Sequence, residues 1–352
     1  MKIIKQTSPY IHKKSSVERM MLDVIIALMP IVIFSIILNG FNAIRVISLS
    51  VFTMLISEFV FVFLKANNTY EGKTTFKEKL IKTKEKYTIN NLLSPLISSL
   101  IYAMIMPSTA SSYVVIVGGL FGIIVGKLLF GGLGSNIFNP AALGRIVAML
   151  FFKIDYKGTN GVDIITSGTP LGELSGNLAN INNYSLLDMF LGTIPGTMGE
   201  TSKILIIIGG LYLFIRFSAD FRPTLGMIGS FTIIMFICSL KLDSINSINF
   251  TLYQLLSGGL LFGAAFMITD PVTSSVTKPG RVTYGIIVGI ICAFIRLLGA
   301  YPEGCAFAIL IGNMLVPVID YYKWSTNKYT IKNISIMALL IIASSLILFF
   351  AI

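Results

Sequence analysis

Apolar residues run along this chain in long blocks separated by shorter polar stretches. Each block holds about 20 residues, the length that spans the hydrocarbon core of a bilayer as an α-helix. The apolar and polar residues do not alternate, as they would in a transmembrane β-barrel. The pattern therefore predicts an all-α polytopic membrane protein with ten transmembrane helices and an apolar tail that is a candidate eleventh. The blocks are 22–39, 46–64, 92–106, 111–130, 139–152, 203–219, 223–240, 253–269, 283–299 and 303–319, with the tail at 334–351.

Composition strengthens this prediction. Hydrophobic residues make up 55% of the 352 residues and charged residues only 12%. Soluble domains carry roughly 25% charged residues. A soluble protein with ten such blocks would expose far too much apolar surface. The lipid bilayer is therefore the predicted surroundings of the chain.

The basic residues predict an orientation. If the N-terminus starts in the cytoplasm, 21 of the 27 lysines and arginines fall in cytoplasmic segments. That set includes seven in residues 65–86, and it counts Lys127 and Arg145 as residues at span ends. Positive charge on the cytoplasmic side is the usual bias of membrane proteins. It places residues 153–202 outside, and it explains the net charge of +11 without nucleic-acid binding.

An internal repeat is visible in the apolar blocks. Met104 and Ile105 precede a proline, a serine pair and the run of residues 122–126. Met267 and Ile268 precede the same features, ending in the run 285–289. The order predicts two inverted five-helix repeats, with ligand sites where they meet. Chance similarity between apolar, serine-rich stretches is the alternative. The predicted units are residues 1–152, an outer loop at 153–202, a second repeat at 203–322, and a basic linker with the tail helix at 323–352.

Two irregular stretches face the cytoplasmic side. Residues 131–141 are rich in glycine and contain Asn136 and Asn139, whose amides could hydrogen-bond a heterocyclic ligand. Residues 269–275 contain Asp270 and Thr273. Irregular backbone at membrane depth is tolerated where it is buried in protein or lines a cavity. Tight turns with capping side chains are the alternative for both stretches.

Three acidic residues are candidates for an ion path. Glu58 lies inside the second block, Asp270 lies at the inner end of the eighth, and Glu303 begins the tenth. Acidic residues within membrane segments commonly mark ion routes. The alternatives are a pair between Asp270 and Arg281, and a favourable position of Glu303 at a helix N-terminus.

The outer loop contains Ser167, Gly168, Thr169 and Pro170 in succession. The proline pushes Thr169 towards an extended conformation, and the small residues leave its hydroxyl accessible. A modifying enzyme needs such a geometry, although many plain loops share it. Further on, residues 184–192 have the pattern of a short interfacial helix.

The chain offers few metal ligands. It has one histidine, His12, and three cysteines with no CxxC pair. We therefore predict no metal site, no haem and no iron–sulfur cluster held by this chain alone.

Several motifs together resemble one family. They are residues 8–11, 131–141, 166–171, 190–192 with 195–196 and 199–200, 269–275, 280–281 and 301–304, in family order. The chain resembles the D subunits of Rnf complexes and, more distantly, the B subunits of sodium-pumping NADH:quinone oxidoreductases. It lacks the long N-terminal extension expected of those B subunits.

The resemblance implies a function. The chain would carry FMN through a phosphoester on Thr169, attached by a flavin transferase outside the cytoplasm; Gly168 stands where alanine is usual. A second, non-covalent flavin, riboflavin, would lie in the bundle, with Asn136, Asn139, Asp270 and Thr273 as candidate pocket residues. The chain would be an electron-transfer subunit of an ion-translocating (Na⁺ or H⁺) ferredoxin:NAD⁺ oxidoreductase in the bacterial cytoplasmic membrane. Ferredoxin and NAD would bind other subunits, and the isolated chain would have no catalytic residues.

Two other classes fit parts of the pattern. A secondary transporter or channel also has inverted repeats and broken helices, but it has no reason to carry a covalent flavin. A purely structural assembly subunit would leave the complex active without flavin on this chain.

Overall fold

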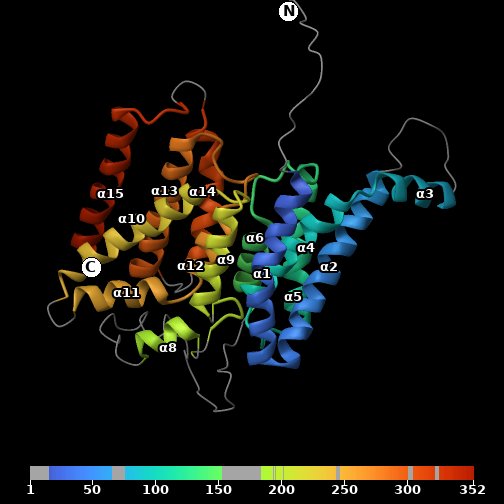
Figure 1. Ribbon diagram of the computed structural model, residues 1–352, viewed down its shortest axis with the longest axis horizontal. Coiled ribbons are helices and arrows are strands. Elements are labelled where there is room, and N and C mark those ends of the chain that lie inside the picture. Colours follow the sequence, from blue (N-terminus) through green and yellow to red (C-terminus); the bar gives the residue numbers. More distant parts are fainter. Residues whose placement is uncertain are drawn as a thin grey trace, which may run out of the picture.

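The computed structural model describes residues 16–65, 76–152, 184–192, 194, 196–200, 202–242, 246–299, 304–321 and 325–352. Over these ranges the chain is helical and contains no β-strand (Figure 1). The helices are α1 (Val17–Asn39), α2 (Phe41–Lys65), α3 (Phe76–Lys86), α4 (Ile89–Met104), α5 (Ser112–Gly126), η1 (Leu128–Phe130), α6 (Pro140–Phe151), α8 (Leu186–Leu191), α9 (Lys203–Ile215), α10 (Phe221–Ser239), α11 (Ser247–Leu256), α12 (Leu260–Phe262), η2 (Gly263–Met267), α13 (Lys278–Leu298), α14 (Cys305–Ile319) and α15 (Ile331–Ala351).

Each predicted apolar block coincides with a helix or a group of helices. The helices α1, α2, α10, α13, α15 and the segment formed by α5 with η1 are long and apolar enough to cross a membrane. The apolar helices α4, α6, α9 and α14 are shorter. The prediction of an all-α polytopic membrane protein is confirmed. The tail predicted as an eleventh span is α15.

The two predicted repeats run in opposite directions. Helix α1 begins at the end of the bundle where α3 lies, whereas α9 begins at the opposite end, near α8 (Figure 1). The equivalent helices α1 and α9 contact each other, and so do α6 and α14. Within the halves, α2 packs on α5 as α10 packs on α13. This arrangement agrees with the prediction of two inverted five-helix repeats.

An ion pair fastens α1 to the second half. Asp23 is 2% exposed, and one of its carboxylate oxygens lies 3.2 Å from the Arg216 guanidinium. The hydroxyls of Tyr212 and Ser218 donate to the same carboxylate, at 3.2 and 2.5 Å. A buried carboxylate needs such partners, because it has lost its contacts with water.

The eighth predicted span is broken near its middle. Helix α11 and the segment 260–267, which ends in a π-helical turn, meet at an angle of 63°. The carbonyls freed at the break are capped by buried cations. The Arg296 guanidinium donates to the carbonyls of residues 254 and 257, and Lys203 Nζ donates to the Gly258 carbonyl at 3.2 Å. Unpaired carbonyls are costly in a membrane, so these contacts stabilise the break.

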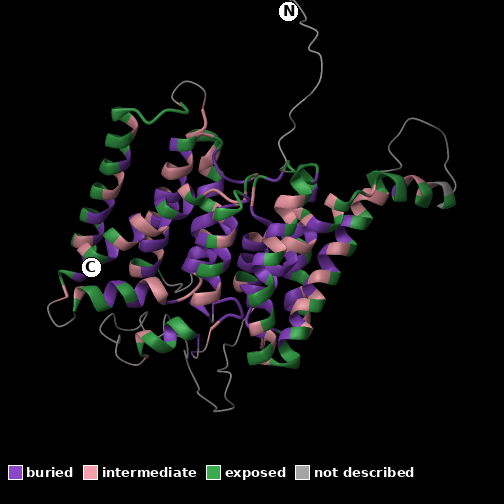
Figure 2. Cartoon of the chain, in the orientation of Figure 1, coloured by how far each residue is buried: buried purple, intermediate pink, exposed green. Residues whose placement is uncertain are grey.

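Four basic side chains lie inside the bundle rather than in loops. Buried residues fill the bundle interior (Figure 2), and they include Lys127 and Arg145, each 2% exposed. Lys203 and Arg296 are also buried. Arg145 lies in the middle of α6, so its assignment to a cytoplasmic span end was wrong. Lys127 directly follows α5, as assigned, but its side chain is buried rather than exposed. Charge counting along a chain cannot detect a buried partner, and Lys127 has one, described below.

Two short helices lie at opposite ends of the bundle. Helix α8 confirms the predicted short helix: Ser185 Oγ accepts from the Asp188 amide at 3.0 Å, and Gly192 ends the helix with φ +94°. It lies at the end opposite α3 (Figure 1). Helix α3 was not predicted, because its sequence is mostly charged.

Candidate cofactor-binding site

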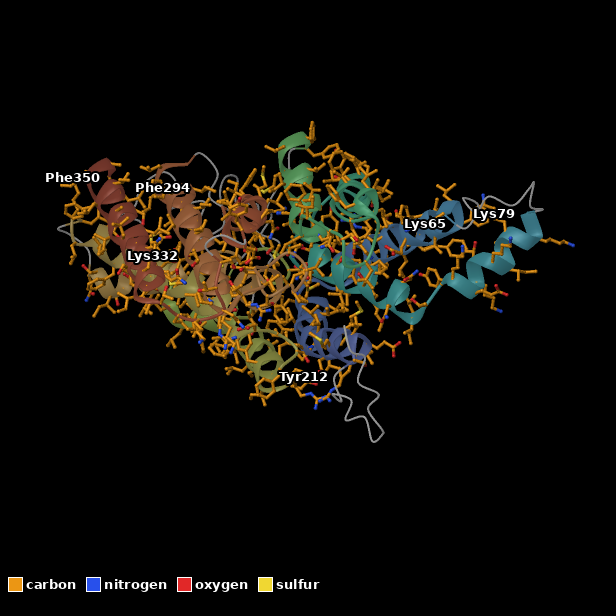
Figure 3. All side chains as sticks on the ribbon, turned by 90° about the horizontal axis from the view of Figure 1, so that it is seen from above. Lys65, Lys79, Tyr212, Phe294, Lys332 and Phe350 are labelled. Carbon is orange, nitrogen blue, oxygen red and sulfur yellow. The ribbon has the colours of Figure 1, made fainter. Side chains whose placement is uncertain are left out.

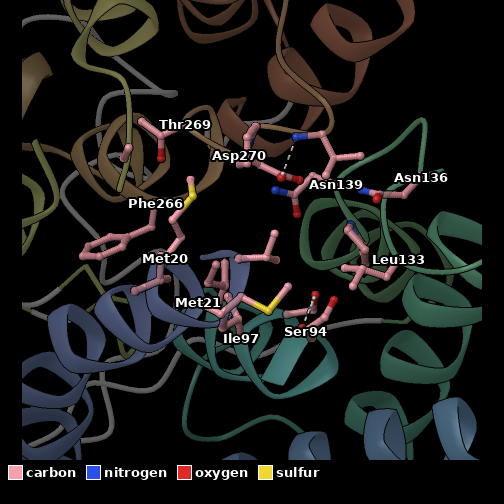
Figure 4. Close-up of a pocket in the computed structure, with 18 of the residues that line it drawn as sticks. Met20, Met21, Ser94, Ile97, Leu133, Asn136, Asn139, Phe266, Thr269 and Asp270 are labelled. Carbon is pink, nitrogen blue, oxygen red and sulfur yellow. Dashed lines mark hydrogen bonds between the residues drawn. The ribbon is translucent and has the colours of Figure 1, made fainter. Parts of the chain in front are cut away.

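A cavity of about 480 Å³ lies where the two halves meet. The first half contributes the start of α1, α4 and the turn before α6; the second half contributes the end of α9 and the turn after η2. Side chains from these elements point into one space in Figure 4. Most of the wall is apolar, with a few polar groups contributed by both halves. The polar lining residues are Ser94, Ser98, Lys127, Asn136, Asn139, Ser218, Thr269 and Asp270.

Glycines fold the turn that carries both candidate asparagines. Gly131, Gly132 and Gly134 have φ of +115°, +99° and +85°. Residues with a Cβ rarely adopt this left-handed region. The reversal leads the chain back to α6 and places Asn136 and Asn139 on the cavity wall. The glycine-rich motif is therefore explained by the turn it forms.

Asn139 has two structural tasks. Its Oδ1 accepts from the amides of Ala141 and Ala142, at 3.0 and 3.3 Å, which caps α6. Its Nδ2 donates to the Met267 carbonyl of the other half at 3.3 Å. The capping interpretation therefore holds for Asn139, and the same side chain also joins the two cavity-lining turns.

Asp270 lies on the cavity wall, held by its own turn. Its Oδ1 accepts from the Val272 amide at 3.1 Å and its Oδ2 from the Thr273 hydroxyl at 3.2 Å. The Asn136 Nδ2 donates to the Phe138 carbonyl at 3.4 Å, within its own turn. Thr273 is not among the lining residues, so it acts by orienting Asp270. The predicted juxtaposition of Asn136, Asn139 and Asp270 is seen in Figure 4.

Asn313 on α14 links the two turns and was missed in the sequence. It is 1% exposed. Its Oδ1 accepts from the backbone amide of Asn139 at 3.2 Å, and its Nδ2 donates to the Thr273 carbonyl at 3.2 Å. The Tyr284 hydroxyl accepts from the same Nδ2 at 2.8 Å. The only signal was a single amide side chain in an otherwise apolar helix.

Glu58 reaches the cavity through a lysine. Lys127 Nζ lies 2.8 Å from Glu58 Oε2, and the two side chains are 2% and 3% exposed. Lys127 also lines the cavity, and it lies near enough to Asp270 for electrostatic attraction. Glu58, predicted from its membrane depth alone, is thus one end of a series of alternating charges with Lys127 and Asp270. Glu58 and Lys127 are buried, and Asp270 is half-buried.

Arg281 does not pair with Asp270. Its guanidinium contacts Asp220, at the start of α10, together with Arg222 at 2.7 Å. Burial alone would raise the pKa of Asp220, but the Arg222 amide and the two guanidinium groups outweigh it and hold this pKa below its usual value. Arg281 also donates to the Ser275 carbonyl at 3.0 Å. Arg281 therefore connects the start of α10, through Asp220, to the turn that carries Asp270.

A pH dependence follows from the lowered pKa of Asp220. A carboxyl group whose pKa is lower in the folded state contributes stability above its unfolded pKa of about 3.9, and this is lost as pH falls through the folded value. We expect Asp220→Asn to lower the free energy of unfolding at neutral pH by about 1–2 kcal/mol. Below about pH 4 the difference from wild type should shrink. Thermal unfolding in detergent across pH measures the loss of stability at neutral pH and its decrease at low pH. A difference between variant and wild type that grows at low pH would contradict the stabilising role of the Asp220 carboxylate.

Five predicted residues lie outside the described ranges. They are Ser167, Gly168, Thr169, Pro170 and Glu303. Their roles stay predictions.

Comparison with known proteins identifies the family. A model of the NQR2, RnfD, RnfE family matches residues 4–328. The chain belongs to this family. The match contains both cavity-lining turns, the segment around Thr169 and every motif on which the resemblance rested. Helix α15 lies beyond it.

Curated relatives come from two kinds of complex. The chain is 32% identical over 336 residues to the D subunit of the proton-translocating ferredoxin:NAD(+) oxidoreductase complex of Clostridium ljungdahlii, covering 90% of this chain and 93% of the relative. It is 31% identical over 342 residues to the D subunit of the ion-translocating oxidoreductase complex of Stutzerimonas stutzeri, covering 87% and 90%. It is 35% identical over 260 residues to the B subunit of the Na(+)-translocating NADH-quinone reductase of Chromohalobacter salexigens, covering 72% and 63%.

Proposed function

We propose that this chain is the membrane electron-transfer subunit of an ion-translocating ferredoxin:NAD⁺ oxidoreductase complex. It carries FMN covalently on Thr169 and riboflavin in the cavity between the two halves. The observation that carries the proposal is this cavity: it has an apolar wall and convergent amide and carboxylate groups, within a chain aligned over most of its length with subunits of redox-driven complexes.

The residues of the cavity fit a flavin ring. Its volume of about 480 Å³ falls within the range of small-molecule sites, roughly 300–1,000 Å³. Met20, Ile97 and Phe266 offer apolar surface for the ring system. Asn136 and Asp270 offer hydrogen bonds to the polar edge of a heterocycle. A bound flavin would supply one-electron chemistry, while the protein sets position and potential.

The FMN proposal rests on the Thr169 motif and on its segment. A phosphoester needs only an accessible hydroxyl and a transferase, so no catalytic triad is required in this chain. Helix α8, further along the same segment, lies at the bundle end opposite the start of α1 (Figure 1). That arrangement supports an attachment site on the outer face, with the N-terminus in the cytoplasm.

The ion path is proposed to use Glu58, Asp270 and Glu303. Glu58 and Asp270 flank Lys127 beside the cavity, so a change in the charge of a bound cofactor would be felt by both carboxylates. Movement of Na⁺ or H⁺ would be coupled to electron transfer through such charges. Partners would be the other membrane and peripheral subunits of the complex and, during maturation, a flavin transferase.

The cavity assignment predicts a loss of riboflavin when a hydrogen-bonding group is removed. We expect Asn136→Ala to weaken riboflavin binding roughly tenfold, since a ligand hydrogen bond is worth about 1–1.5 kcal/mol. Flavin released by denaturing the purified protein, separated by chromatography, reports the non-covalent flavin. FMN on Thr169 would stay with the protein, so the two flavins are counted separately.

Asn246→Ala is the matched control. Asn246 is also an asparagine in a turn before a helix, since it caps α11, but it does not line the cavity. Its removal should leave the riboflavin content unchanged. Equal riboflavin content in both variants and in wild type, at limiting riboflavin, would contradict the cavity assignment.

A further inference from the structure

Helix α3 is the most strongly basic element among the described helices. It carries five lysines and two glutamates in its 11 residues. It lies at the end of the bundle where α1 begins and runs across the direction of α1 (Figure 1). Seen from above, it extends beyond α2 and away from the bundle, with Lys65 and Lys79 at that corner (Figure 3).

One face of α3 is fixed on α2. Thr83 is fully buried. Lys79 Nζ lies 4.3 Å from the centroid of the Phe63 ring, a cation–π contact. Just after the helix, the rings of Tyr87 and Phe59 meet edge to face with centroids 6.0 Å apart. These contacts hold α3 to the membrane-spanning helix, so its position at the bundle end is part of the fold.

The opposite face combines an exposed apolar residue with exposed lysines. Ile81 is 60% exposed, although isoleucine rarely faces water. Lys77 lies four residues before it and Lys84 three residues after it, and both are exposed. At 100° per residue, these three side chains share one face, away from Thr83. Two ammonium groups thus flank an apolar side chain.

We propose that α3 lies in the surface of the bilayer and binds anionic phospholipid headgroups of the leaflet around the N-terminal end of the bundle. Ile81 would enter the boundary between headgroups and acyl chains, while Lys77 and Lys84 extend to the phosphates, as basic residues do at membrane interfaces. Each lysine near an anionic surface strengthens such binding.

The position and charge of α3 favour lipid over an acidic protein. The helix projects sideways from the end of the bundle, beside the C-terminal end of the membrane-spanning helix α2. Lys65, the last residue of α2, adds positive charge at the same corner. A cationic, partly apolar surface parallel to the bundle end matches a layer of anionic headgroups around it.

A spin label at residue 81 tests the proposal in the full-length chain. The native cysteines Cys238, Cys292 and Cys305 are buried, so Ile81→Cys can be labelled selectively. The protein is reconstituted in phosphatidylcholine alone and with about one third phosphatidylglycerol. We expect the label to move from contact with a water-soluble relaxant to contact with oxygen in the anionic bilayer. High salt should partly reverse this change.

Two pairs of lysines provide the comparison. Lys77→Gln with Lys84→Gln should lower the ratio of inserted to exposed label roughly 25-fold, and glutamine keeps the helix propensity of lysine. Lys328→Gln with Lys332→Gln, exposed residues around the start of α15, should leave it unchanged. The proposal would be overturned if anionic lipid did not change the accessibility of the label, or if both pairs of substitutions had the same effect. It would also be overturned if the label were protected only when other subunits are bound.

Discussion

Replacing Thr169 with alanine should abolish covalent flavin on this chain. A phosphoester requires a hydroxyl oxygen, and alanine has none, so no partial attachment at this position is possible. The chain is co-expressed with a flavin transferase and its partner subunits, and a denaturing gel is viewed under ultraviolet light. Wild type should fluoresce at the mass of this chain, and Thr169→Ala should not.

Thr159→Ala is the matched control for this experiment. Thr159 lies ten residues before Thr169 in the same outer segment and also bears a hydroxyl, but it stands outside the motif of residues 166–171. This variant should keep most of its fluorescence. A dark wild-type band, beside a flavin-bearing partner that fluoresces in the same lane, would contradict the Thr169 assignment. It would favour a transporter or a structural assembly protein instead.

The helical segments could be predicted because the membrane leaves the chain little choice. A backbone in lipid must satisfy its own hydrogen bonds, so a long apolar block has to be a helix. The block predicted at 203–219 is α9, and the tail predicted at 334–351 is α15. The repeat was visible because both halves place a Met-Ile pair and a serine pair at the same distances before a glycine-containing helix.

The interior contacts could not be read in the same way. Lys127 lies next to the end of an apolar block, and only the fold brings it to Glu58, 69 residues earlier in the chain. Asn313 likewise gains its role from two turns that lie far from it in sequence. Hydropathy also depends only on composition, so it does not predict where a membrane-spanning segment bends. The break after α11 depends on Lys203 and Arg296, which come from α9 and α13 and donate to the carbonyls of residues 258 and 257 at the break.

Half of the candidate site was therefore predictable. The glycine-rich turn and the Asp270 turn are irregular stretches between apolar blocks, and an inverted repeat places both at the same end of the bundle. That these turns share one cavity is a result of packing, because Asn139 reaches across to the Met267 carbonyl. The sequence did not predict that Lys127 lies between Glu58 and Asp270, because charges near span ends are ordinarily assigned to loops.

Removing the positive charge of Lys127 should destabilise the protein strongly. In Lys127→Met the Glu58 carboxylate stays buried without its partner, which typically costs about 3–5 kcal/mol. Methionine fills a similar volume, so little of the loss would come from a cavity. The free energy of unfolding of the purified chain in detergent should fall by this amount, a large share of the stability of an ordinary domain.

The double variant separates the buried charge from other effects. In Lys127→Met with Glu58→Gln no unpaired charge remains, so most of the lost stability should return, because a buried ion pair contributes little net stability over a neutral replacement. Glu58→Gln alone leaves the lysine unpaired and should cost nearly as much as Lys127→Met. If the two single losses simply add in the double variant, the residues do not act as a pair, and the proposed coupling between Glu58 and the cavity through Lys127 would fail with it.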